Sequence, residues 1–247
     1  MTKPGFLRRK STYFVGVPLL ILIAVIAGPF VYIHFIEGPA PKKLGFDSIT
    51  TTTTKAKSSE STTSTTAAAD VSSGSLDGTW KIADGSVVGY RVKEVLFGQS
   101  TTAVGRTSAI TGNLAITATK VPSADFTVDL TKVKSDQSNR DNQFQSRIMN
   151  TSQFPTATFK LTSPITLSSV PKDKVPVTTS ATGDLTLHGV TKSVTFDVTA
   201  QRDGDKVEVT GSIPVTFADY SIPNPTFGPA TVGDNGTLEF ALAFTKS

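Results

Sequence analysis

Alternation of apolar and polar residues runs through roughly the last two thirds of this chain and limits what it can fold into. In the stretch KSVTFDVTA, Val194, Phe196 and Val198 point to one side, and the residues between them point to the other. A segment with this period is a strand that buries one face. We count eight such strands in the sequence. Their apolar positions are Val88, Tyr90 and Val92; Ile110, Leu114 and Ile116; Phe126, Val128 and Leu130; Ala157, Phe159 and Leu161; Leu185 and Leu187; Val194, Phe196 and Val198; Val207, Val209, Ile213, Val215 and Phe217; and Leu238, Phe240, Leu242 and Phe244.

Eight antiparallel strands, each with one apolar and one threonine-rich face, predict an all-β barrel over residues 77–247. Closure removes the exposed edges of a sheet, and an eight-stranded barrel is just wide enough to hold one ligand. A two-layer sandwich is the structural alternative. A domain of about 170 residues can bury a core without disulfides. The chain has no cysteine, which also excludes thiol catalysis.

One stretch, SNRDNQFQSRIMNTSQF, breaks the alternation and predicts a short helix. Phe144 and Ile148 are four residues apart, which places them on one helical face. Ser138 or Asn139 is expected to cap the start of this helix. We expect the helix to cover or plug one end of the barrel, with Phe144, Ile148 and Phe154 packed inward.

A membrane segment is predicted ahead of the barrel. Residues 13–36 contain no Asp, Glu, Lys or Arg, and as a helix these 24 residues would span about 36 Å. The basic tail of residues 1–12 favours a cytoplasmic N-terminus, which makes the chain a single-pass cell-membrane protein with a signal anchor and an extracytoplasmic C-terminal domain. A cleaved signal peptide is the alternative, but its apolar core would be only about 7–15 residues long.

The stretch between the membrane segment and the barrel, residues 37–76, is rich in serine and threonine and is predicted to be a disordered linker. As a flexible coil it would span about 35 Å on average. The chain carries a net charge of +4, but residues 77–247 hold 16 Lys and Arg against 16 Asp and Glu. A neutral domain without a basic stripe does not indicate a nucleic-acid partner.

The barrel region resembles a known family. Trp80 opening the first strand, NRD followed by a short helix, FPTATF and GDLTLHGVTKSVTFDV are similar in order and spacing to the YceI-like domain, over essentially all of residues 77–247. The stretches FADY and GTLEF are similar to the variant found in actinobacterial envelope proteins. The resemblance implies a lipocalin-like barrel that binds a polyisoprenoid chain, such as an isoprenoid quinone or polyprenyl carrier, in lipid carriage or in envelope stress handling.

Candidate ligand contacts follow from combining the barrel with this resemblance. We expect Arg140, Gln143 and Arg147 near the mouth to contact a headgroup, and Arg140 to pair with a carboxylate of the barrel. An apolar tunnel is expected to be lined by Tyr90, Val92, Leu114, Phe126, Val128, Phe159, Leu185, Phe196 and Phe217.

The sequence favours binding over catalysis. Gln143 stands where the family usually has a histidine in an Arg-Asp-x-His-Leu motif, so chemistry that needs a titrating imidazole there is not expected. His188 is expected at a turn. The domain has no phosphate loop, nucleophile elbow or metal-ligand cluster in its sequence, so we expect no enzyme activity, cofactor or metal. An envelope interaction module with a filled barrel is the alternative function, and the sequence leaves homodimer formation open.

Overall fold

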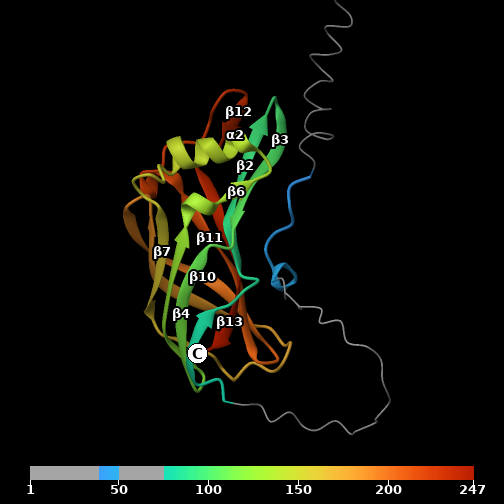
Figure 1. Ribbon diagram of the computed structural model, residues 1–247, viewed down its shortest axis with the longest axis vertical. Coiled ribbons are helices and arrows are strands. Elements are labelled where there is room, and N and C mark those ends of the chain that lie inside the picture. The colour runs from blue at the N-terminus through green and yellow to red at the C-terminus, as the bar shows by residue number, and fades with distance from the viewer. Residues whose placement is uncertain (1–38, 50–74) are drawn as a thin grey trace, which may run out of the picture.

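Eight antiparallel strands close into a barrel in the computed structural model, which describes residues 39–49 and 75–247 (Figure 1). Pairing of the first and last strands, with Trp80 opposite Lys246, closes the ring. The predicted barrel is thus confirmed over the sandwich alternative. In order around the ring the strands are β1 (Gly78–Ile82), β4 (Ile110–Thr117), β5 (Lys120–Asp129), β7 (Thr156–Ser163), β9 (Val177–Leu187), β10 (Val190–Asp203), β11 (Lys206–Thr216) and β13 (Asn235–Lys246).

Two walls of the barrel extend beyond this ring. β2 (Val87–Leu96) follows β1 along the same partner, β13, and β3 (Gln99–Thr107) pairs with β2 and leads into β4. The eight strands predicted from alternation include β2 but neither β1, whose five residues are too few to show the pattern, nor β3, whose residues QSTTAVGRT lack apolar alternation. Three short strands complete the sheet: β6 (Lys134–Ser135) pairs with β3, β8 (Ile165–Thr166) with β5, and β12 (Ala230–Val232) with β2.

The predicted helix covers the end of the barrel that carries β12 (Figure 1). It consists of α2 (Ser138–Gln143) and a following π-helical turn, η4 (Phe144–Ile148), closed by a hydrogen bond from Met149 N to Phe144 O of 2.8 Å. Two short 3₁₀ turns, η3 (Leu130–Lys132) and η5 (Phe217–Tyr220), lie at the same end of the barrel.

Two details of this helix differ from the prediction. The N-cap is Gln137, without a side-chain cap, because Asp141 instead anchors the helix by accepting hydrogen bonds from Ser135 N (2.7 Å) and Ser135 Oγ (2.8 Å). Phe154 does not pack into the barrel. Its ring lies 4.6 Å from that of His188, which occupies the expected turn with a φ of 48°.

The core fills the closed end of the barrel and its walls. Phe244 on β13 is completely buried, and Trp80 on β1 is 3% exposed. The Trp80 indole Nε1 donates a hydrogen bond of 2.8 Å to Leu76 O, which ties the chain before the first strand to the barrel.

Replacing Trp80 by phenylalanine is expected to cost about 1 kcal/mol, because it removes this buried hydrogen bond and leaves Leu76 O without its donor. The measurement is the urea unfolding midpoint of the variant against that of wild type. An unchanged midpoint would contradict a role for the hydrogen bond in stability.

Part of the predicted linker is ordered. Residues 41–49, here called the strap, lie along the outside of β2 and β13 and contain the 3₁₀ turn η2 (Phe46–Ser48). Ile49 is buried against Ala241 and Ala243, and Leu44 and Phe46 pack beside it. The prediction of a disordered linker over residues 37–76 is wrong for the strap, because these three apolar side chains find a complementary surface on the barrel.

The remaining N-terminal predictions fall outside the described residues. These are the cytoplasmic tail of residues 1–12, the membrane segment 13–36 and the linker residues 50–74. Within residues 39–49 and 75–247, no helix is long and apolar enough to cross a membrane.

Candidate functional site

A large apolar cavity occupies the barrel. Its volume is about 1170 Å³, above the roughly 300–1,000 Å³ of ordinary ligand pockets. The lining residues that are exposed to solvent all lie at the end that carries α2 and β12, so this end is the mouth of the cavity. These exposed lining residues are Phe97, Asn139, Asn142, Phe227 and Pro229.

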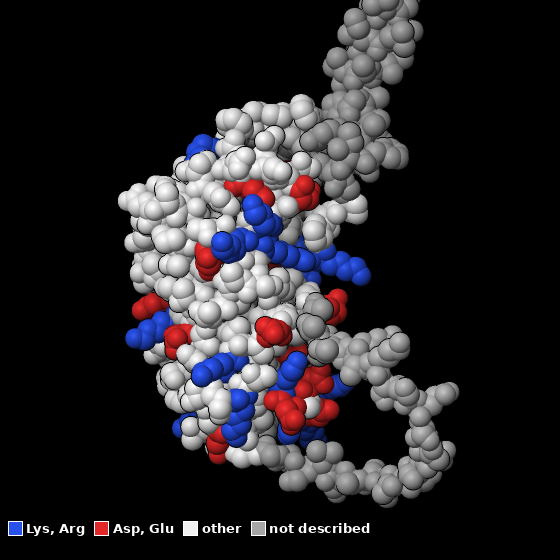
Figure 2. Space-filling view, viewed as in Figure 1, with Lys and Arg blue, Asp and Glu red and all other residues white. Residues whose placement is uncertain are grey.

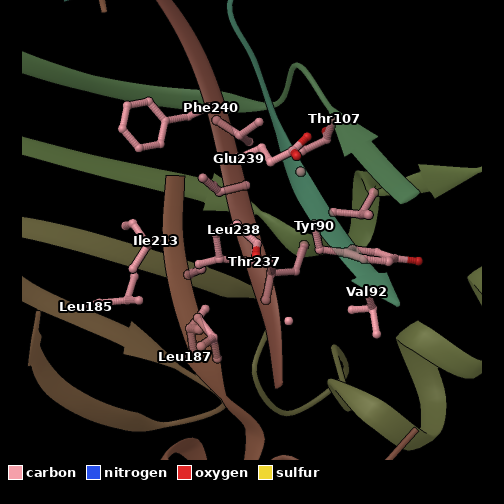
Figure 3. Close-up of a pocket in the computed structure, with 18 of the residues that line it drawn as sticks. Tyr90, Val92, Thr107, Leu185, Leu187, Ile213, Thr237, Leu238, Glu239 and Phe240 are labelled. Carbon is pink, nitrogen blue, oxygen red and sulfur yellow. The ribbon is translucent and has the colours of Figure 1, made fainter. Parts of the chain in front are cut away.

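All nine residues predicted to line the tunnel do line this cavity. Tyr90 and Val92 enter from β2 and Leu185 from β9, and Figure 3 shows them together with Leu238 of β13 around the same space. The barrel interior is therefore not filled by its own side chains.

Small residues explain why the interior is hollow. Ala157 on β7 and Ala181 on β9 line the cavity at inward-facing positions, and both are buried. A leucine or phenylalanine at such a position would fill the space, as the core of a small barrel usually is filled. Inward alanines within alternating strands are thus the sequence signal that could have indicated a cavity. Further alanines that line the cavity are Ala103, Ala124, Ala200 and Ala230.

Aromatic rings make up much of the wall in edge-to-face contacts. The ring of Phe196 lies 5.4 Å from that of Phe159 and 6.0 Å from that of Phe240, with interplanar angles of 71° and 80°. The rings of Phe126 and Phe244 are 5.8 Å apart and tilted at 53°. The edge-to-face geometry of the first two pairs is a favourable one for aromatic rings. It holds the rings against the wall and leaves the centre of the barrel open.

Tyr90 joins the cavity wall to the helix that covers its end. Its ring stacks on Phe144 with the centroids 5.1 Å apart and an interplanar angle of 11°. Burial raises the pKa of the Tyr90 hydroxyl, so this group stays neutral at physiological pH. Gly105 on β3 is required here, because a Cβ at that position would lie 2.3 Å from the Tyr90 ring.

Polar side chains concentrate at the mouth. Arg140 pairs with Glu94 at 3.1 Å and with Asp136, as expected for an arginine that reaches a carboxylate of the barrel. Arg140 and Gln143 line the cavity, whereas Arg147 lies just outside it.

Arg147 holds the mouth together from outside. Its Nε donates to Gln143 Oε1 at 2.9 Å, and its Nη2 donates to Pro225 O at 2.9 Å. Its guanidinium also lies 5.4 Å from the centre of the Phe227 ring. Arg147 thus connects η4 to the loop of residues 221–229.

The mouth itself was missed in the sequence analysis. Phe97 in the β2–β3 turn and Phe227 in the loop of residues 221–229 are 51% and 59% exposed. Both loops fall outside the alternating strands, and they meet through the pairing of β12 with β2 and a hydrogen bond of 3.3 Å from Phe97 N to Pro229 O. Within the part of the chain that the structure describes, no cluster of three or more His, Cys, Asp or Glu side chains is placed to hold a metal ion.

Comparison with known proteins identifies the family of this barrel. The sequence profile of the YceI-like domain matches residues 80–244. The chain belongs to the YceI-like domain family. Protein YceI of Escherichia coli and of Shigella flexneri are each 39% identical to it over 90 residues, which are 35% of this chain and 43% of the relative. The chain thus spans less than half the length of the curated relatives it matches.

Two solved structures share the fold. A polyisoprenoid binding domain from Saccharophagus degradans, implicated in plant cell wall breakdown, superposes with a TM-score of 0.56 at 16% identity and covers 68% of this chain and 98% of that one. BcnA of Burkholderia cenocepacia superposes with a TM-score of 0.51 at 19% identity and covers 64% and 95%. At these identities the likeness establishes the YceI-like fold alone.

Proposed function

We propose that the barrel binds the hydrocarbon chain of a polyisoprenoid, or of a similarly long lipid, and that the protein presents this site outside the cell membrane to which its N-terminus anchors it. The observation that carries the proposal is the apolar cavity of about 1170 Å³ that opens at the end carrying α2 and β12, with polar groups at its mouth. The family membership and the polyisoprenoid binding domain that shares the fold support the same class of ligand.

The energetics of such a tunnel are adequate for binding. Burial of apolar groups contributes about 0.8 kcal/mol per CH₂, so each five-carbon isoprene unit gains about 4 kcal/mol before costs. The loss of motional freedom on binding takes about 4–15 kcal/mol of this gain. Several isoprene units must therefore enter the cavity for tight binding, which favours long chains over short ones.

Headgroup contacts are proposed for the polar groups at the mouth. The side chains of Asn139 and Asn142 are exposed there and line the cavity, and Gln143 lies beside them. Arg140 and Arg147 are already committed to Glu94 and to the Pro225 carbonyl. We therefore assign the two arginines to shaping the mouth, and the amides to hydrogen bonds with a hydroxyl, quinone oxygen or phosphate.

The proposal is tested with a fragment of residues 39–247, which contains the whole barrel and the strap. Purified without detergent, it is expected to carry one prenyl lipid per chain, seen by native mass spectrometry and identified after solvent extraction. An empty barrel that also fails to take up added prenyl alcohols and quinones would contradict the proposal. That result would favour the alternative of an interaction module.

A further inference from the structure

The outer face of β13 is shaped to receive the strap. Outward positions on a barrel strand are normally polar and solvated, yet Ala241 and Ala243 face outward with no exposed surface. Their small side chains leave room for Ile49. The strap lies before residues 80–244, which are the part matched by the family, and so falls outside the matched domain.

Polar contacts fix the strap at its other end. Arg91 pairs with the buried Glu239 at 2.6 Å, and its Nη2 donates to Pro41 O at 2.7 Å. Glu239 also accepts a hydrogen bond of 3.4 Å from Leu44 N, and Arg106 donates to Lys42 O. Burial lowers the pKa of the Arg106 guanidinium. The strap is thus held by main-chain hydrogen bonds and by apolar packing together.

These contacts give the strap a direction. Pro41 lies beside Arg91, whereas Ile49 lies farther down β13 against Ala241 and Ala243. β2 runs the opposite way, from Val87 up to the mouth. The N-terminal end of the strap therefore points toward the mouth, and in Figure 1 the upper end of the blue segment lies at about the height of α2.

The rim of the mouth has the composition of a lipid-facing surface. We define the rim as residues 95–103 and 221–233, and neither stretch contains a charged residue. Three of the five exposed large hydrophobic residues among those described, Val95, Phe97 and Phe227, belong to it. The other two, Val170 and Val175, flank the charged run Lys172, Asp173 and Lys174 at the opposite end. Figure 2 shows the end with α2 and β12 mostly free of charge and the lower half rich in it.

Chain length brings the predicted membrane segment to this rim. Four residues, 37–40, separate Ile36, where the predicted segment ends, from Pro41, and the five Cα-to-Cα steps between these two residues reach at most about 18 Å. The six residue steps from Arg91 on β2 to Phe97, just after its end, rise about 20 Å. The two lengths match, so a docked strap holds the rim at the height of the membrane surface and replaces a tether of about 40 residues by one of about four.

We propose that the rim docks on the surface of the lipid bilayer, held there by the strap, so that the cavity opens directly into the membrane. A lipid chain then passes between bilayer and barrel without crossing water. The orientation rests on the proposed anchor and lipid ligand and adds to them a defined membrane-facing surface.

Single cysteines test this orientation, because the chain has none of its own. The full-length protein carries either Ser100→Cys on the rim or Asp205→Cys in the β10–β11 turn at the opposite end, each labelled with a nitrobenzoxadiazole fluorophore. The variants are reconstituted in phosphatidylethanolamine and phosphatidylglycerol vesicles that contain nitroxide-labelled phospholipid. Quenching by the lipid nitroxide is expected to be at least threefold stronger at position 100 than at position 205.

Strap variants test the cause of the orientation. Ile49→Asp places a charge against Ala241 and is expected to reduce the quenching at position 100 toward that at position 205. Asp47→Asn changes an exposed strap residue and is expected to leave the quenching unchanged. Both changes lie outside the barrel, so circular dichroism of each variant should match that of wild type.

Two results would overturn the inference. Equal, weak lipid quenching at both positions would place the rim in water. Protection of position 100 from aqueous iodide without lipid quenching would mean that a second copy of the chain covers the rim. The bound prenyl lipid is extracted and measured from the same samples. If the lipid is present in samples that show either of these two results, the proposed orientation is wrong and the ligand proposal stands. If the lipid is absent from a sample with strong quenching at position 100, the docking stands and the ligand proposal fails.

Discussion

Replacement of Ala181 by tryptophan is expected to weaken the binding of long prenyl lipids at least tenfold while the barrel stays folded. Ala181 is 3% exposed and lines the cavity from β9, so a tryptophan side chain there extends into space that is empty. A large side chain normally strains a close-packed core, but here the cavity accepts it. A tenfold loss corresponds to about 1.4 kcal/mol, which is less than the gross gain from one isoprene unit.

The neighbouring residue provides the control. Thr182 points to the outside of the same strand, where its hydroxyl lies 2.8 Å from that of Thr195. Thr182→Trp adds the same side chain without touching the cavity and should bind long prenyl lipids like wild type. The measurement is a titration of each variant with prenyl alcohols of increasing length, and short chains should bind Ala181→Trp better than long ones. Equal affinity of Ala181→Trp and wild type for all lengths would mean that the lipid does not lie in this cavity.

The ring of strands was predictable because burial of one face imposes a period of two on a strand. β11 and β13 follow that pattern almost from end to end, with Val207 and Leu238 among the inward residues. β3 was not predictable in this way, because its cavity-facing positions carry the small residues Ala103, Gly105 and Thr107, of which Gly105 lies against the Tyr90 ring. Short-range alternation reports on a strand only where its inward side chains are large.

The strap was missed for a related reason. Its apolar residues Leu44, Phe46 and Ile49 stand among lysines, serines and threonines, and three such side chains can bury little apolar surface against one another. The complementary signal lies about 190 residues away, at Ala241 and Ala243, whose small size at outward positions of a strand makes sense only if another segment covers them. Two complementary features so far apart in the sequence can be related to each other only once the structure shows that they are in contact.

The candidate site was predictable in its walls and not in its mouth. An inward position on a barrel strand lines whatever lies inside, so alternation alone placed Phe126 and Phe196 at the cavity. Loop residues such as Phe97 and Phe227 have no period that reports their surroundings. Gln143 illustrates the limit, because its position in a family motif placed it at the mouth, while its hydrogen bond with Arg147 depends on the helix turn between them.

Replacement of Phe144 by aspartate is expected to destabilise the barrel by about 3 kcal/mol or more. Phe144 is 8% exposed and stacks on Tyr90, so the change removes the burial of a large ring and puts a carboxylate in its place. For a domain of about 170 residues this corresponds to a fall in Tm of about 6–12 °C. Glu94 and Asp136 lie near Tyr90 and would repel the new charge, and Arg140, already paired with both, compensates only in part.

Two further variants separate the helix as a packed cover from the helix as a loose lid. Phe144→Leu keeps an apolar side chain and loses mainly the ring stacking, about 0.5–1.5 kcal/mol, so its melting temperature should lie between those of wild type and Phe144→Asp. Phe227→Asp makes the same chemical change at a side chain that is 59% exposed and should leave the melting temperature within a degree or two of wild type. All three are measured on lipid-extracted protein, because a bound lipid stabilises the folded state by mass action and would mask the differences. If Phe144→Asp has the same melting temperature as Phe227→Asp, the ring of Phe144 does not hold η4 on the barrel. The mouth is then closed by a helix that can open without destabilising the core.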